Sequence, residues 1–171
     1  MKYNKIAFIG MMGSGKTTIA RLLAFKTGLD FFEADEIFVQ NEKMKIKDFF
    51  KKFGENSFRE KETEILKEIS KKENFILSCG GGVVLKKENR DILFNNDIFT
   101  IYLEASSKTI FERIKEDTKR PLLQVLNPKE EIKKIIKERE EFYNLANLKI
   151  ITDNKTKNEI VEEIFNLLWK K

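Results

Sequence analysis

Short apolar runs alternate along the chain with longer stretches in which apolar residues recur every three or four positions. The runs predict buried strands near residues 4–9, 30–34, 74–79, 97–103 and 148–152. The stretches between them predict helices near residues 15–27, 36–42, 46–53, 56–72, 86–94, 106–116, 128–146 and 156–169. Because strands that alternate with helices are typical of βαβ units, we expect an α/β fold. Its core would be a doubly wound, five-stranded parallel sheet flanked by helices.

A glycine-rich turn follows the first apolar run directly. Residues 10–17 read G-M-M-G-S-G-K-T, which fits the phosphate-binding pattern G-x-x-x-x-G-K-[ST] between a strand and a helix. The loop predicts a nucleoside-triphosphate site in which Lys16 reaches the β- and γ-phosphates and the Thr17 hydroxyl binds Mg²⁺. The loop residues that we expect to contact the nucleotide are Gly13, Ser14, Gly15, Lys16, Thr17 and Thr18. The alternative, a plain glycine turn, is weaker because the motif is complete and in its usual place.

Two carboxylates, Glu33 and Asp35, follow the second predicted strand. Residues i and i+2 of a strand face the same way, so we expect both side chains to converge at the rim of the sheet. A Mg²⁺–triphosphate site usually needs a carboxylate, and the third predicted strand ends in glycines rather than in an aspartate. Glu33 or Asp35 is therefore the nearest candidate for that acid, the alternative being two solvated acids in a loop.

Three consecutive glycines, Gly80–Gly82, follow the third predicted strand. Such a run suits neither a strand nor a helix, but it lets the main chain and its N–H groups approach a ligand closely. Beside a phosphate loop we interpret it as part of the site, the alternative being a flexible turn.

Arginine is used sparingly, at six of the 33 basic positions. A planar guanidinium binds carboxylates and phosphates through paired hydrogen bonds, so each arginine is a candidate anion ligand. Arg139 lies on the apolar stripe of a late predicted helix, and Arg59 lies three residues before Glu62, which could orient it. The two arginines predict a small carboxylate- or phosphate-bearing ligand, the alternative being two internal salt bridges. Arg90 is interpreted as a surface residue.

The helical pattern is interrupted between residues 116 and 128. Pro121 holds Arg120 out of the preceding helix, so this stretch is predicted to be a loop that presents a cation. A mobile lid that carries an arginine to the transferring phosphoryl group is one way to exclude water from such a site. The alternative is a plain connector.

Taken in order, these motifs resemble the shikimate kinase family, small phosphate-loop enzymes of aromatic amino-acid biosynthesis, over essentially the whole chain. The matching segments are Gly10–Thr17, Glu33–Asp35, Phe58–Glu62, Gly80–Gly82, Arg120–Leu123 and Arg139–Tyr143. The resemblance implies a single phosphate-loop kinase domain over residues 1–171. Its fold would be that of phosphate-loop NTPases and nucleoside-monophosphate kinases. A substrate-binding helical segment would lie at about 33–60 and a lid at about 114–127.

The resemblance also implies an activity and an acceptor site. ATP would phosphorylate the 3-hydroxyl of shikimate. Asp35 would bind the ring hydroxyls and accept the proton, and the chain has no histidine that could do so instead. Arg59 and Arg139 would hold the carboxylate, with Glu62 beside them and the Gly81 N–H in contact with the substrate.

On the nucleotide side, the resemblance implies that Lys16 and Arg120 neutralise the transferring phosphoryl group. Arg113 and Lys155 would flank the adenine. One Mg²⁺ per subunit would be bound with the help of Thr17 and Glu33. The family normally has aspartate where this chain has Glu33, so we expect a changed arrangement of outer Mg²⁺ ligands with activity retained.

Composition narrows the remaining possibilities. A hydrophobic content of 41% with two prolines is typical of an ordered globular chain, and the single Cys79 cannot form an intrachain disulfide. No apolar stretch is long enough to cross a bilayer. The net charge of +5 is spread over basic residues interleaved with acidic ones. We therefore expect a cytoplasmic monomer with small-molecule ligands and neither a nucleic-acid nor a membrane partner.

Three other functions are compatible with parts of the sequence. A different small-molecule kinase, such as one acting on gluconate or a nucleoside, would share the loop, sheet and lid, and the two arginines favour a carboxylate-bearing acceptor such as gluconate. A guanine-nucleotide switch needs Asp-x-x-Gly and Asn-Lys-x-Asp, whereas residues 78–82 read S-C-G-G-G and residues 154–157 read N-K-T-K. The switch is therefore rejected, and a nucleic-acid-binding module would rest on charge alone.

Overall fold

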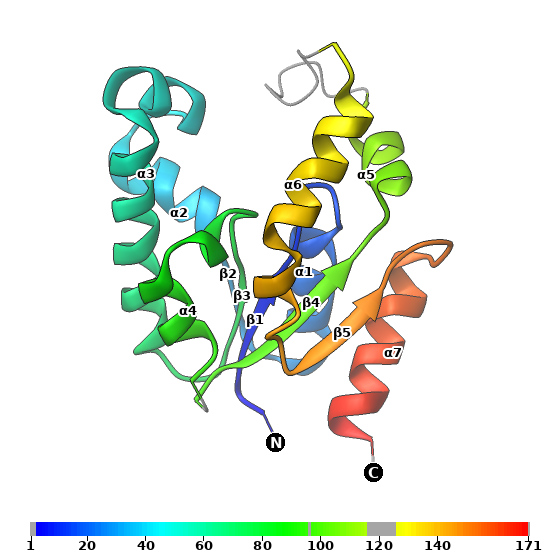
Figure 1. Ribbon diagram of the computed structural model, residues 1–171. Helices are drawn as coiled ribbons and strands as arrows, with labels where there is room; N and C mark the ends of the chain where they lie inside the picture. The colour runs from blue at the N-terminus through cyan, green and yellow to red at the C-terminus, as the bar shows by residue number, and fades with distance from the viewer. Residues whose placement is uncertain (1–2, 96, 116–125, 171) are drawn as a thin grey trace.

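The computed structural model describes residues 3–95, 97–115 and 126–170. Within them, five parallel strands form one sheet in the order β2-β3-β1-β4-β5 (Figure 1). The strands are β1 (Lys5–Ile9), β2 (Asp30–Glu33), β3 (Phe75–Ser78), β4 (Phe99–Glu104) and β5 (Leu148–Ile151). The predicted parallel sheet is confirmed.

Each predicted helix has a counterpart in the structure. The helices are α1 (Lys16–Thr27), α2 (Ala34–Glu42), α3 (Ile46–Ser70), the 3-10 turn η1 (Val83–Leu85), α4 (Lys87–Leu93), α5 (Ser107–Ile114), α6 (Pro128–Tyr143) and α7 (Lys157–Trp169). The two helices predicted on either side of residue 54 run on as α3, which is broken at Gly54 with φ 80° and ψ 172°. Glycine adopts that backbone conformation readily, which explains the break in the helical pattern. The turn η1 was not predicted.

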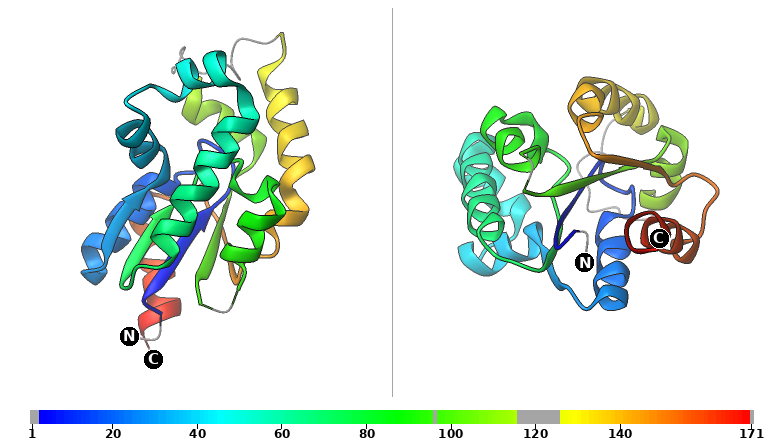
Figure 2. Two further views of the ribbon diagram at one scale, coloured as in Figure 1. Left: turned by 90° about the vertical axis from the view of Figure 1, so that its left-hand side faces the viewer. Right: turned by 90° about the horizontal axis from the view of Figure 1, so that it is seen from below.

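Helices cover both faces of the sheet (Figure 2). Ile6 and Phe8 of β1 face α1 and α7, whereas Ala7 and Ile9 face the side covered by α3, α4 and α6. All four side chains are fully buried. Burial on both sides of a parallel strand explains why β1 is a continuous apolar run rather than an alternating one.

The strand order brings three strand ends together. Phe8 of β1 and Glu33 of β2 are both in register with Ser78 of β3. The segments that follow these strands therefore leave the sheet side by side, at the carboxyl edge where ligands bind in open α/β sheets. Those segments are the phosphate loop, the turn into α2 and the glycine triplet.

Two sequence-based expectations concern residues that the structure does not describe. The lid predicted at about 114–127 falls mostly outside the described residues, and Arg120 falls outside them altogether. The helix after this segment, α6, begins at Pro128. Asn127 caps it, because its side chain accepts a hydrogen bond from the Glu130 N–H, and a proline in the first turn is also typical of a helix start. In the described ranges, no helix combines the length and the apolar character needed to span a membrane.

Candidate active site

The phosphate loop owes its shape to glycines that no other residue could replace without strain. Gly10, Gly13 and Gly15 have φ values of 139°, 77° and 99°. A Cβ on Gly10 would lie 2.6 Å from the Leu103 carbonyl oxygen, and one on Gly13 would lie 2.7 Å from the side chain of Ile114. The loop is therefore held tightly between the end of β1, β4 and α5, and it leads directly into the N-terminus of α1.

Lys16 lies buried within this loop. Its ammonium group donates hydrogen bonds to the carbonyl oxygens of Gly10, at 2.8 Å, and Met11, at 3.0 Å. The side chain thus curls back over the loop that it belongs to. An anionic phosphate oxygen is a stronger hydrogen-bond acceptor than a neutral carbonyl, so an arriving triphosphate would compete well for this ammonium group.

Glu33, Thr17 and Ser78 form a small cluster of oxygen atoms beside the loop. Glu33 is 8% exposed, and its Oε2 has no hydrogen-bond partner among the described residues. Burial raises the pKa of this carboxyl group above its usual range, although hydrogen bonds from Thr17 and Ser78 oppose the shift. The Thr17 and Ser78 hydroxyl oxygens lie 3.5 Å apart. An unpartnered carboxylate oxygen beside hydroxyls is a donor set that suits Mg²⁺.

Asp35 reaches the site by a different route from the one predicted. Strand β2 ends at Glu33, and Asp35 belongs to the first turn of α2, so the alternation of side chains along a strand does not apply to it. The prediction that Glu33 and Asp35 share one face of a strand was therefore wrong. Both residues nevertheless line one cavity, because the helix begins at the rim of the sheet.

The glycine triplet is the point where several segments meet. A Cβ on Gly80 would lie 2.7 Å from Glu62 Oε1, and a Cβ on Gly81 would lie 3.2 Å from the backbone nitrogen of Met12. A Cβ on Gly82 would overlap the guanidinium group of Arg59. The triplet is therefore a close-packed junction between the phosphate loop and α3, rather than a flexible turn.

Arg59 is held by two carboxylates of its own helix. Its Nη1 donates to Glu62 Oε2 at 2.8 Å, while its Nη2 and Nε donate to Glu55 Oε1 at 3.1 and 3.3 Å. Glu62 is 5% exposed, and burial raises its pKa despite the charge of Arg59. Burial also disfavours the charge of Arg59, but the two carboxylates outweigh it and raise the pKa of the guanidinium. The predicted contact with Glu62 is confirmed, and that with Glu55 was missed.

Arg139 is held differently. Its Nη1 donates to the carbonyl oxygen of Gly81 at 3.1 Å, and the same oxygen accepts a 2.5 Å hydrogen bond from the Tyr143 hydroxyl. Tyr143 is fully buried and stacks on Tyr102 with the ring centroids 5.0 Å apart. The late helix α6 thereby fixes the middle of the glycine triplet, and the partner of Arg139 in this contact is a neutral group.

Arg113 and Lys155 both donate a hydrogen bond to the carbonyl oxygen of Thr152, in the segment after β5. Arg113 donates to the carbonyl oxygens of Ser14, at 3.1 Å, and Thr152, also at 3.1 Å, so it links the phosphate loop to the segment after β5. Lys155 follows in that segment and pairs with Glu163 at 2.6 Å. The linking role of Arg113 was not predicted.

Arg90 corrects a sequence-based interpretation. It is only partly exposed, and its Nη1 donates to the carbonyl oxygens of Val84 and Leu85 at 2.7 and 2.8 Å. Its guanidinium also lies 4.2 Å from the centre of the Phe142 ring. The residue therefore joins η1 to α6 instead of being an ordinary surface residue.

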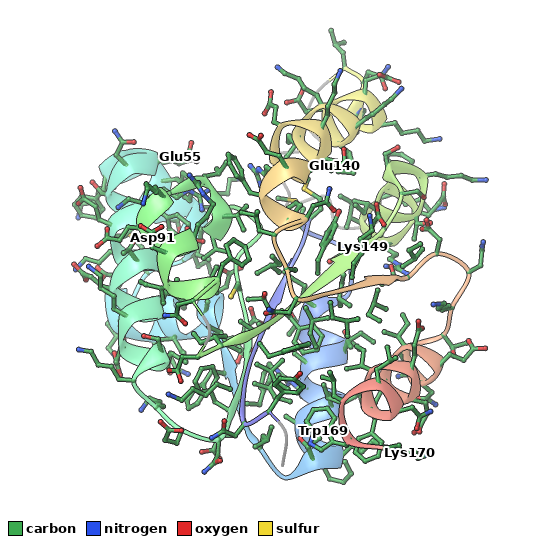
Figure 3. All side chains as sticks on the ribbon, turned by 60° about the horizontal axis from the view of Figure 1, so that its bottom comes forward. Glu55, Asp91, Glu140, Lys149, Trp169 and Lys170 are labelled. Carbon is green, nitrogen blue, oxygen red and sulfur yellow. The ribbon has the colours of Figure 1, made fainter. Side chains whose placement is uncertain are left out.

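One cavity of about 350 Å³ connects the loop, the acids and the glycines. Its lining consists of Met12, Gly13, Gly15, Lys16, Thr17, Thr18, Glu33, Asp35, Cys79, Gly80, Gly81 and Arg113. The Cys79 thiol is buried there, and burial raises its pKa, which disfavours the reactive thiolate. Figure 3 shows Glu55 on α3 and Glu140 on α6, the two helices whose arginines reach the glycine triplet.

A phosphate loop that opens on a small cavity with a carboxylate, next to two guanidinium groups, defines a class: a phosphate-loop kinase of small molecules. Within that class, the chain belongs to the shikimate kinase family. The family model described as "Shikimate kinase" matches residues 12–169.

Individual relatives agree with this assignment. The shikimate kinase of Thermodesulfovibrio yellowstonii is 43% identical over 159 residues, which are 93% of this chain and 91% of the relative. That of Sulfurihydrogenibium sp. is 38% identical over 167 residues, covering 97% of this chain and 98% of the relative. The resemblance inferred from the motifs is confirmed.

Solved structures give the same result. The shikimate kinase of Acinetobacter baumannii in complex with shikimate has a TM-score of 0.91 and 31% identity, covering 96% of this chain and 92% of that one. The enzyme of Aquifex aeolicus has a TM-score of 0.84 and 32% identity, covering 98% and 99%. A gluconokinase from Sinorhizobium meliloti, with a TM-score of 0.59 and 19% identity, shares the fold alone over 95% of this chain and 89% of its own.

Proposed function

We propose that the protein transfers the γ-phosphoryl group of ATP to the 3-hydroxyl of shikimate. The observation that carries this proposal is the glycine triplet. Gly81 packs against the phosphate loop and accepts a hydrogen bond from Arg139, while Gly82 packs against Arg59. The proposed phosphate and carboxylate sites would thereby lie next to each other, joined by the glycine triplet. The relatives named shikimate kinase support the identity of the acceptor.

On the nucleotide side, the proposed contacts follow the loop. Residues 13–18 would bind the phosphates through their N–H groups and hydroxyls, and Lys16 would leave its two carbonyl partners for the β- and γ-phosphates. Arg113 and Lys155 would flank the adenine. Arg120, outside the described residues, would contact the phosphates from a lid at about 114–127.

Thr17 and Glu33 would hold one Mg²⁺. The unpartnered Oε2 of Glu33 supports this assignment. Within the described residues, no group of three or more acidic or cysteine side chains could hold a metal ion unaided. The remaining ligands would therefore be water and phosphate oxygens, as is usual for this ion. When bound, Mg²⁺ would neutralise charge on the phosphates.

On the acceptor side, Arg59 and Arg139 would bind the carboxylate, and the Gly81 N–H would contact the substrate. Glu62 would orient Arg59. Asp35 would bind the ring hydroxyls and take up the proton of the 3-hydroxyl at its carboxylate. Because phosphoryl transfer passes through a loose transition state, positioning matters more than base strength, and an ordinary aspartate suffices.

The proposed unit of activity is one chain. We propose a monomeric, single-domain enzyme whose acceptor segment spans about 33–60. We also propose that the enzyme acts in the cytoplasm, where ATP is available.

The experiment is a coupled assay of ADP release from ATP and Mg²⁺, with shikimate, gluconate or a nucleoside monophosphate as the acceptor. We expect rapid ADP release only when shikimate is the acceptor. Mass spectrometry should then show a product that is heavier than shikimate by one phosphoryl group. Turnover with gluconate but not with shikimate would contradict the proposal. The Lys16→Ala variant serves as a control for contaminating kinases.

A further inference from the structure

The Nη2–Nε edge of the Arg59 guanidinium is already occupied. The Nη1 of Arg59 donates a hydrogen bond to Glu62, while its Nη2 and Nε both donate to one carboxylate oxygen of Glu55. The main chain of Gly82 packs closely against the same group. A carboxylate that is to pair with the Nη2–Nε edge of Arg59 must therefore replace Glu55 there.

Of these partners, Glu55 is the one that can leave. Its side chain is 58% exposed, whereas that of Glu62 is 4% exposed and Gly82 contributes main chain. Glu55 also directly follows the break at Gly54, so it occupies the first turn of the second half of α3. A carboxylate near a helix N-terminus is favourable, so Glu55 keeps a stabilising environment after its release.

We infer that Glu55 is an internal competitor for the acceptor carboxylate. It occupies the Nη2–Nε edge of Arg59 in the absence of acceptor, and an acceptor carboxylate that pairs with this edge displaces it. The inference rests on the proposed function, because it takes Arg59 as a ligand of the acceptor. Glu55 would thus set the acceptor affinity, and it would keep weakly binding anions away from Arg59.

The two arginines then have different parts in acceptor recognition. Arg139 donates to the neutral Gly81 carbonyl, so an acceptor carboxylate can approach it without displacing an anion. At Arg59 the acceptor exchanges with one carboxylate, which makes the net gain at that residue small. A competitor of this kind lowers affinity without touching the reacting atoms.

The test compares Glu55→Gln with Glu60→Gln. Glu60 is exposed, lies in the same helix next to Arg59, and loses the same unit of charge. For Glu55→Gln we expect the KM for shikimate, and the Kd measured by calorimetry, to fall roughly two- to fivefold, the range of an exposed ion pair. The kcat should stay the same, and inhibition by inorganic phosphate should become stronger. Glu60→Gln should change none of these values.

An unchanged or higher KM in Glu55→Gln would overturn the inference, since Glu55 would then be indifferent or a brace for Arg59. In an Arg59→Ala background the effect of Glu55→Gln should vanish. If it persists there, Glu55 acts through its charge at a distance and the inference also fails. The unaltered enzyme distinguishes failure of this inference from failure of the proposed function. If that enzyme does not turn over shikimate, the proposed function itself is refuted.

Discussion

The proposed nucleotide half of the site is built mainly from main chain, whereas the proposed acceptor half is built from charged side chains. In the phosphate loop, positive φ angles at Gly10, Gly13 and Gly15 fix the path of the backbone, and Lys16 binds carbonyl oxygens. In the acceptor half, by contrast, carboxylates of α3 hold Arg59. The first kind of site is rigid and general for phosphate groups, whereas the second can be altered one side chain at a time.

This contrast teaches where specificity resides. A loop of N–H groups binds any triphosphate, so it carries little information about the acceptor. Under the proposed function, the acceptor would be chosen by the spacing of Arg59 and Arg139 around the glycine triplet. Substitutions in the acceptor half should therefore change the acceptor parameters and leave ATP binding intact.

The largest effect is expected from Asp35→Asn, which removes the proposed proton acceptor but keeps its shape. We expect kcat to fall by roughly 10²- to 10⁴-fold. The Kd for ATP should hold, because the phosphate loop is unchanged. The measurements are coupled ADP release and calorimetric titration with ATP. Asp30→Asn, an exposed acid at the opposite end of β2, is the matched control. Near-normal turnover of Asp35→Asn would reject the assignment.

The next effect separates the two arginines. Arg139→Ala should raise the KM for shikimate roughly 10- to 100-fold, the value of a lost charge-assisted hydrogen bond, at nearly constant stability. Arg59→Ala should raise KM as well, but it should also destabilise the fold by about 3 kcal/mol, because Glu62 is left buried without its partner. Steady-state kinetics and urea unfolding measure the two quantities.

Arg21→Ala is the control for this pair, since Arg21 is an exposed arginine outside the site. Loss of ATP affinity equal to the loss of shikimate affinity would show that Arg59 and Arg139 are structural. The division of the site into two halves would then be wrong.

Much of this arrangement could be predicted from the sequence because it is local. Apolar periodicity located all five strands, and the motif of residues 10–17 located the phosphate loop. Asp35 was correctly placed at the site, although the helix that carries it begins earlier than expected. Glu55 lies four residues before Arg59, at a spacing typical of a helical ion pair, and attention to that spacing would have found it.

The rest could not be predicted because it joins distant parts of the chain. Arg113 and Ser14 are 99 residues apart, and Arg90 reaches Phe142 on another helix. Such contacts depend on how the helices pack on the sheet, which periodicity does not specify. A basic residue read alone, such as Arg90, therefore looks like a surface residue.

A smaller effect is expected from Gly82→Ala, which tests the junction itself. With φ −99° the backbone of Gly82 accepts alanine, but the new methyl group would overlap the Arg59 guanidinium. We expect the KM for shikimate to rise roughly tenfold, with the Kd for ATP unchanged. In the control Gly28→Ala, at a helix end with φ +74° and open space around it, stability should fall while KM holds. An equal rise of the KM for shikimate in Gly82→Ala and in Gly28→Ala would contradict the prediction.

The smallest effect is expected from Glu62→Gln, which removes the buried carboxylate of the acceptor half. Burial raises the pKa of Glu62, so between the unfolded and folded pKa values the folded chain holds more protons than the unfolded one. Stability contributed by this group therefore falls as the pH rises above its usual pKa near 4.5. Relative to the unaltered protein, Glu62→Gln should gain stability as the pH rises from that value towards neutrality.

Urea unfolding at a series of pH values measures this change, with Glu64→Gln as the control. Glu64 is 63% exposed and pairs with Lys61, so its substitution should show no such trend. A constant difference between Glu62→Gln and the unaltered protein would mean that Arg59 fully compensates the buried carboxylate. The acceptor half would then bear no energetic cost from its buried carboxylate, and its contrast with the main-chain phosphate loop would be one of geometry alone.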